Sequence, residues 1–247
     1  MKLGESVGLK LGGALSPVVG WVARLRHARM FHPTGIVLRT EVTALERTGP
    51  LGQVARRLEG PALVRLSSAW WKGEKEWLDD LGCAVRFRSD PAITPTPSPG
   101  DQDLLFATIR QPITTLPAVL TTDVHDFLAN DYYAVSPFHV AELGRVKWRL
   151  VSAGPSLAGA SRRERLLRAA EEGRARFRLE VRRTGAGAGW QPVAELTLLE
   201  PVELDQAALR FSPFRVGRGI EPRGLVHAMR AWTYARSQAA RPAASSP

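Results

Sequence analysis

Residues 81–88 read LGCAVRFR and residues 103–109 read DLLFATI, and four prolines lie in the loop between them, at residues 91–101. In the first stretch two sets of residues alternate: Cys83, Val85 and Phe87 against Ala84, Arg86 and Arg88. This alternation predicts a half-buried strand, and the apolar second stretch predicts a buried one. Proline sustains neither a sheet nor a helix interior, so the intervening residues are expected to form a loop.

Further strands are predicted on both sides of this pair. β-Branched residues and partial alternation mark Gly35–Thr43, Pro61–Ser67, Arg145–Ser152, Ala175–Arg183 and Val193–Leu199. The sequence TGAGAG at 184–189 predicts a hairpin between the last two. Strands without a regular strand–helix–strand rhythm favour an α+β fold built on an antiparallel β-barrel or sandwich.

Three segments are predicted to be helical: Leu116–Asn130, Ser161–Gly173 and the Ala-rich Leu225–Arg241. Ser161 is expected to cap the second helix and Gly173 to end it. We expect a single domain over residues 1–247, with an N-terminal arm at 1–23 and a frayed tail at 242–247.

The formal net charge is +10, from 34 Lys and Arg against 24 Asp and Glu, and most of the basic residues are arginine. Such an excess suits nucleic acid, an anionic membrane or an acidic ligand equally. The basic residues are scattered and form no block of like charge, so charge selects no partner.

The single cysteine, Cys83, excludes an internal disulfide and suits a reducing compartment, so we expect a cytoplasmic protein. Its apolar surroundings favour core packing over reactivity. No apolar run approaches the roughly 20 residues that cross a bilayer, and the first residues lack a signal-peptide core.

The common enzyme motifs are missing from the sequence. The five histidines form none of the close pairs typical of zinc sites, and the sequence contains no phosphate-binding loop, GxGxxG or GxSxG.

The C-terminal helix carries a more specific pattern. Arg230, Tyr234 and Arg241 fall within ~40° of one another on a helix of 3.6 residues per turn. They form either a solvated polar face or a site where Arg230 favours the Tyr234 phenolate, a known axial ligand for heme iron.

Two further positions have both a structural and a functional interpretation. His32, which follows Arg29 in the run Arg29-Met-Phe-His32, is either a turn residue or a reactive imidazole. Arg65 lies within an apolar strand, where a guanidinium is costly to bury unless an anion such as a carboxylate meets it.

In chain order these motifs resemble those of the catalase superfamily, between about residues 24 and 241. The matching segments are Arg29-Met-Phe-His32-Pro-Thr-Gly35, Val64-Arg65-Leu66-Ser67, Gly82-Cys-Ala-Val-Arg-Phe87, Gln102-Asp103-Leu104-Leu105 and the spacing of Arg230, Tyr234 and Arg241. Phe211-Ser-Pro-Phe214 and Pro222-Arg-Gly224 look like the short catalase-like bacterial proteins, which end soon after this helix.

The sequence also departs from that pattern. Catalases place an asparagine after the Asp-Leu-Val strand, whereas the corresponding Phe106–Pro112 contains none, and Gln111 is only a candidate substitute. The long C-terminal helical region of full-size catalases is absent too. Nicotinamide binding is therefore not expected, and the resemblance leaves a homo-oligomer open without implying the catalase tetramer.

The resemblance implies a catalase-like heme-binding barrel with peripheral helices and a C-terminal helix that carries the proximal tyrosine. Heme b would lie inside the barrel with Tyr234 as axial ligand and Arg230 stabilising its charge. Arg29, Arg65 and Arg241 would neutralise the propionates, and His32 would act as acid and base on hydrogen peroxide or an organic hydroperoxide.

Loss of the distal asparagine implies weak dismutation and a peroxidase-like reaction with an unidentified electron donor; isomerisation of an organic hydroperoxide also stays open. The alternative function is a non-catalytic heme carrier or sensor on the same fold. Nucleic-acid binding is disfavoured because it leaves the ordered motifs unexplained.

Overall fold

The computed structural model describes residues 35–69, 75–109, 120–134, 136–185, 187–206 and 208–223. The predicted N-terminal arm, the helix Leu225–Arg241 and the tail lie outside these ranges. Within them the chain forms two α-helices, a short 3-10 helix and ten strands. The strands are β1 (Gly35–Ala44), β2 (Gly60–Ser68), β3 (Leu81–Phe87), β4 (Gln102–Ala107), β5 (Tyr132–Tyr133), β6 (Phe138–Val140), β7 (Gly144–Ser152), β8 (Arg176–Arg183), β9 (Gln191–Pro201) and β10 (Ile220–Pro222).

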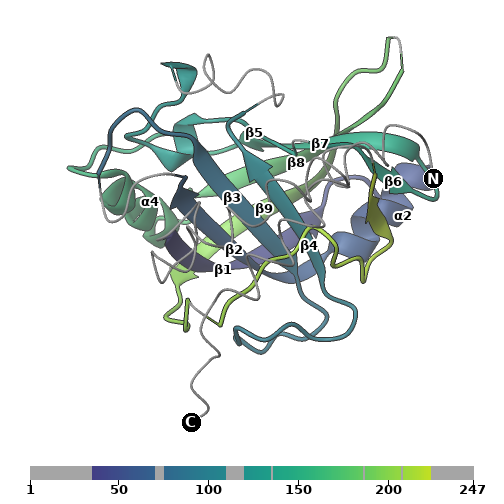
Figure 1. Cartoon of the computed structure of the whole chain (residues 1–247), viewed down its shortest axis with the longest axis horizontal. Coiled ribbons are helices and arrows are strands. Elements are labelled where there is room, and N and C mark those ends of the chain that lie inside the picture. Colours follow the sequence, from purple (N-terminus) through teal and green to yellow (C-terminus); the bar gives the residue numbers. More distant parts are fainter. Residues whose placement is uncertain are drawn as a thin grey trace, which may run out of the picture.

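Eight of the described strands close into an antiparallel barrel (Figure 1). They follow one another in the order β7-β5-β4-β3-β2-β1-β9-β8, and β8 pairs again with β7. The short strands β6 and β10 continue the sheet outward from β7. The predicted fold class, an α+β fold on an antiparallel barrel with peripheral helices, is confirmed.

One cluster of apolar side chains fills the barrel interior, and all eight barrel strands contribute to it. Along β2 the interior takes Ala62, Val64 and Leu66, whereas Leu63 packs in a second cluster on the outer face. Its largest fully buried members include Trp148, Tyr132, Phe87 and Phe177. An eight-stranded barrel is only wide enough for such side chains. The expectation that heme lies inside the barrel is therefore wrong.

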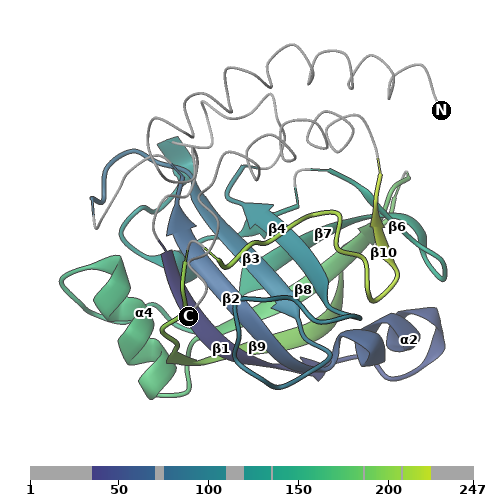
Figure 2. The same cartoon turned by 60° about the horizontal axis from the view of Figure 1, so that its bottom comes forward.

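Helices α2 (Gly49–Leu58) and α4 (Arg162–Glu171) cover opposite ends of the barrel (Figure 2). The prediction for α4 is confirmed: Ser161 Oγ accepts the backbone N–H of Glu164 at 3.2 Å, and Gly173 follows at φ 66°. Helix α2 was not predicted because glycine and proline lower the helix propensity of its first turn. Proline is tolerated there, and three apolar residues of the helix are buried: Val54, Ala55 and Leu58. In the described part of the chain, no helix is long and apolar enough to span a membrane.

Two local predictions differ from the structure. Beyond Thr121 the predicted helix Leu116–Asn130 gives way to turns and the 3-10 helix η2 (Phe127–Ala129). The side chain of Asp126 accepts the backbone N–H of Leu128 at 2.7 Å, and Asn130 Nδ2 donates to the carbonyl of Asp123 at 2.8 Å. Such local side-chain bonds compete with helix formation.

Strand β3 was expected to be half-buried, but both of its faces are covered. Arg86 is fully buried, and Arg88, which follows the strand, is 2% exposed. The cover is the segment that follows β9, residues 202–219, here called the strap. It crosses the outer face of β1–β4 before entering β10 (Figure 2).

Candidate functional site

The outer face of β1–β4 carries two rows of side chains in direct register. One row runs Val37, Arg65, Ala84 and Leu105; the next runs Gly35, Ser67, Gly82 and Ala107. Residues directly opposite one another in an antiparallel pair point to the same face. Because Val37 belongs to the outer cluster, both rows face away from the barrel interior.

The second row consists of the smallest side chains, so the sheet surface there is low. Glycine within a strand often marks a place where a ligand or another backbone approaches closely. The first row is apolar apart from Arg65. Together they form a flat floor with one cation at its centre.

Arg65 is only 3% exposed, which confirms that it is a buried arginine on a strand. Its Nε donates to Gln206 Oε1 of the strap at 3.0 Å, and Gln206 Nε2 donates to the carbonyl of Gly35 at 2.8 Å. A Cβ on Gly35 would lie 2.8 Å from Arg65 Cζ and 2.7 Å from the carbonyl of Leu66. Glycine is therefore required at position 35, because the Arg65 side chain packs over it.

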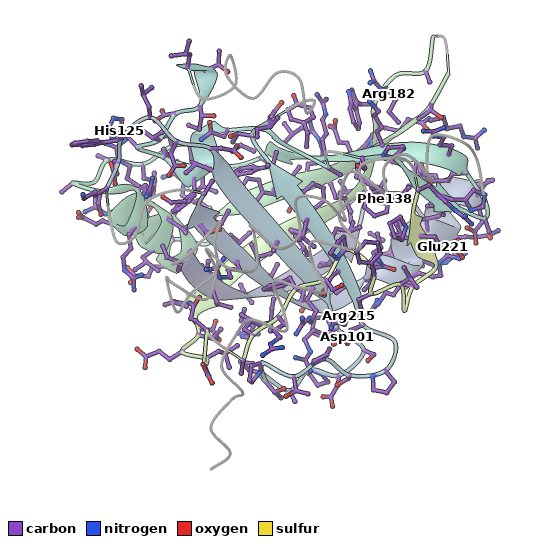
Figure 3. The ribbon with its side chains drawn as sticks, in the orientation of Figure 1. Asp101, His125, Phe138, Arg182, Arg215 and Glu221 are labelled. Carbon is purple, nitrogen blue, oxygen red and sulfur yellow. The ribbon has the colours of Figure 1, made fainter. Side chains whose placement is uncertain are left out.

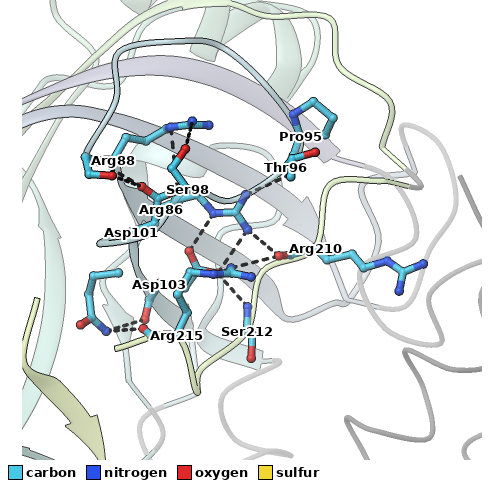
Figure 4. A network of polar contacts seen from close by, with 12 residues as sticks. Arg86, Arg88, Pro95, Thr96, Ser98, Asp101, Asp103, Arg210, Ser212 and Arg215 are labelled. Carbon is cyan, nitrogen blue, oxygen red and sulfur yellow. Dashed lines mark hydrogen bonds and ion pairs between the residues drawn. The ribbon is translucent and has the colours of Figure 1, made fainter. Parts of the chain in front are cut away.

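A buried ionic network fastens the strap to the lower part of this face (Figure 4). Arg86 Nε donates to Asp103 Oδ1 at 2.9 Å, and both side chains are fully buried. Asp103 Oδ2 accepts the backbone N–H of Ser212 at 2.8 Å and also pairs with Arg215. The Phe211 ring lies 4.9 Å from the Arg86 guanidinium. This network holds the strap, and with it Gln206, against the sheet.

The sequence interpretation missed Gln206 and the role of Asp103. A buried arginine in a strand was a usable signal, because it requires a partner. Nothing in the local pattern shows that the partner of Arg65 lies 141 residues away on the strap.

Arg29, His32, Arg230, Tyr234 and Arg241 lie outside the described residues, as does Gln111. Arg65 is thus the predicted site residue that the structure places. Since His32 lies three positions before Gly35, strand β1 connects it in sequence to the start of the small-residue row.

The other tyrosines are engaged elsewhere. Tyr132 is fully buried in the barrel, its hydroxyl donates to the carbonyl of Phe127 at 2.8 Å, and burial raises the pKa of its phenol. Tyr133 donates its hydroxyl to Asp131 Oδ2 at 3.2 Å. Neither is placed as a phenolate ligand on the β1–β4 face, and Tyr234 is the one further tyrosine in the sequence.

The described histidines also lie away from this face. His125 is bonded to Glu76 at 2.8 Å in a loop near α4, and His139 is exposed on β6. Cys83 points into the interior, and burial raises the pKa of its thiol, so the predicted core role is confirmed.

Comparison with known proteins is informative at the level of fold. No family model and no curated protein matches the sequence. The crystal structure of a fungal catalase matches 86% of this chain with a TM-score of 0.60 and 14% sequence identity. The described barrel has a catalase-like fold. The chain spans 59% of the length of that catalase, so the likeness at this identity concerns the fold alone.

Proposed function

We propose that this chain binds heme b against the outer face of β1–β4 and uses it to reduce hydrogen peroxide or an organic hydroperoxide. The observation that carries the proposal is Arg65, a buried guanidinium at the centre of a flat, apolar floor. A porphyrin is flat and mostly apolar, and its propionates are the anions that a buried guanidinium would meet. The catalase-like fold supports the same interpretation.

Within this proposal the residues have separate roles. Arg65, with Arg29 and Arg241, would neutralise the propionates. Tyr234 would hold the iron through its phenolate oxygen, and Arg230 would favour the ionised form of that phenol. When bound, heme would supply an iron with an anionic axial ligand, which favours cleavage of the oxygen–oxygen bond of a peroxide.

His32 would move the proton. Its imidazole would take a proton from one peroxide oxygen and return it to the leaving oxygen, as general base and then general acid. Neither row of the described floor carries an amide that could position a second peroxide. We therefore expect weak dismutation and more oxidation of an organic donor. The lone cysteine suits a reducing compartment such as the cytoplasm.

One observation favours a heme carrier or sensor as the alternative. The floor is apolar except for Arg65 and Ser67, so the described residues bring no acid or base to it. The two functions differ in the role of His32, which only the enzyme requires.

Titration of the purified full-length protein with hemin, followed by absorption, tests the proposal. We expect one heme per chain with a spectrum of high-spin ferric heme bound to tyrosinate. Tyr234→Phe should lose that spectrum, whereas Tyr133→Phe should keep it. If the protein binds no hemin, or if Tyr234→Phe keeps the wild-type spectrum, heme ligation as proposed is wrong.

Peroxide-dependent oxidation of a phenolic donor by the heme-loaded protein separates enzyme from carrier. His32→Ala should keep heme and lose most of the turnover, because the proton transfer is gone. His139→Ala, an exposed histidine on β6, is the matched control and should retain the wild-type rate. Equal turnover in wild type and His32→Ala would favour the carrier. Oxygen release as fast as in full-size catalases would contradict weak dismutation.

A further inference from the structure

We propose that Gln206 is a positioning residue: its side-chain amide fixes the direction of the Arg65 guanidinium, so that the Nη edge is presented to a planar oxyanion. The proposal rests on the proposed function, because the oxyanion it names is a heme propionate. The observation that carries it is a bridge across the floor, from the strap to β2 and β1, made by one amide.

Two contacts restrain Arg65 in this bridge. Its Nε is held by Gln206 Oε1 at 3.0 Å, and its guanidinium packs over Gly35, where a Cβ would be only 2.8 Å from Cζ. An unrestrained arginine has many rotamers, but its planar fork becomes fixed in space once Nε is bonded. With Nε turned toward the strap, the two Nη groups form the remaining edge of the fork. Such preorganisation strengthens binding because less motion is lost on association.

The amide can bond in only one orientation here. A guanidinium only donates, so it requires the amide oxygen, and a carbonyl only accepts, so Gly35 requires the amide NH₂. Gln206 satisfies both at 3.0 and 2.8 Å. Alanine at this position would release both partners, and glutamate could not donate to the carbonyl of Gly35.

The chemistry at Nε also differs between the two buried arginines of this face. The Nε of Arg86 is bonded to a carboxylate, Asp103, within a network that fastens the strap. The Nε of Arg65 is bonded to a neutral amide, which orients the guanidinium without cancelling its charge. An arginine that serves a bound anion must keep that charge, and glutamine is long enough to reach both partners without adding one.

The first arm of the test uses the protein without heme. In ¹⁵N-labelled protein the Arg65 Nε–H signal is assigned by its disappearance in Arg65→Lys. We expect its hydrogen exchange to be about tenfold faster in Gln206→Ala than in wild type, since the loss of one hydrogen bond to a charged group corresponds to at least that factor. Unchanged exchange would overturn the positioning role, whether or not the protein binds heme.

The second arm compares hemin with its dimethyl ester, in which both propionates are neutral. Wild type should bind hemin more tightly than the ester. In Gln206→Ala that preference should fall about tenfold, and it should fall further in Gln206→Glu, where a carboxylate competes for Arg65. Gln191→Glu adds the same charge at an exposed position of β9 and should leave the preference unchanged.

The outcomes separate this inference from the proposed function. If wild type binds neither compound, the heme proposal fails, and the exchange measurement still decides whether Gln206 holds Arg65. If wild type prefers hemin and both Gln206 variants keep that preference, the positioning role is wrong. Circular dichroism and the remaining amide signals report whether each variant is folded.

Discussion

Arginines lie on the outer faces of both halves of the barrel, but under different conditions. On β1–β4, under the strap, Arg86 is fully buried and bonded to Asp103, which lies directly opposite it in register. On β7 and β8, Lys147 and Arg182 lie directly opposite one another with no ion pair to a carboxylate in the described part of the chain. In Figure 3, Arg182 and Arg215 lie on opposite sides of the barrel.

The uncovered face stabilises its cations through aromatic contact and solvent. The Trp190 ring lies 4.8 Å from the guanidinium of Arg182 and 4.6 Å from that of Arg149. Both oxygens of Glu180 are taken, by Arg149 at 2.6 Å and by Arg178 at 2.7 Å. Water screens like charges at a surface, whereas a covered cation needs a bonded anion. Cover, and not the number of arginines, therefore decides which charges are critical.

The largest effect is expected from the covered face. Asp103→Asn removes the anion and leaves Arg86 buried with a neutral partner, so we expect the free energy of unfolding to fall by about 3–5 kcal/mol. Urea unfolding followed by tryptophan fluorescence measures it. The double variant Arg86→Met, Asp103→Leu should recover much of the loss because no charge stays buried. A loss below about 1 kcal/mol in the single variant would contradict the comparison.

A smaller effect is expected at Asp80, a buried acid at the end of β3 that sharpens the comparison because no arginine neutralises it. Asp80 is 5% exposed and Thr108 Oγ1 donates to its carboxylate; burial raises its pKa from 3.8 to about 6. The folded state then holds this proton more tightly than the unfolded state. Its contribution to stability is therefore lost as pH rises from about 4 through 6.

Asp80→Asn removes that dependence. We expect the variant to be more stable than wild type by about 1–3 kcal/mol at pH 8, with little difference at pH 4. Thermal unfolding at the two pH values measures the change. Equal differences at both would mean that the substitution acts through packing and not through ionisation.

The smallest effect is expected on the uncovered face. Lys147→Glu turns a like-charge pair with Arg182 into an opposite-charge pair, so we expect a gain of about 0.5 kcal/mol at low ionic strength. The gain should shrink in 1 M salt because exposed charges are screened. Lys147→Gln, which only removes the repulsion, should give a smaller gain. A loss of several kcal/mol would show that this face is covered after all.

Much of the fold follows from local pattern. The alternation in Gly35–Thr43, Arg145–Ser152 and Ala175–Arg183 predicted strands that the structure contains within one or two residues. The cap at Ser161 was equally readable, because its bond to Glu164 spans three residues. Each of these signals acts between near neighbours in the chain, where spacing alone determines the contact.

Less of the candidate site could be predicted. Arg65 was selected because a charge inside an apolar strand requires a partner, and the structure places it centrally on the outer face. The burial of Arg86 was missed because alternation assigns one face of β3 to solvent and contains no information about the strap. Gln206 was missed for the same reason.

The amino-acid sequence alone determined which segments are extended, where α4 begins and that Arg65 requires a polar partner, since these depend on neighbouring residues. Only the tertiary structure decided that β8 pairs back to β7, that the interior is filled by side chains and that the strap covers β1–β4. Those results depend on contacts between residues far apart in the chain, such as Arg65 with Gln206 and Asp103 with Arg215. Closing such long loops has an entropic cost that only the assembled core offsets, so local pattern cannot reveal it.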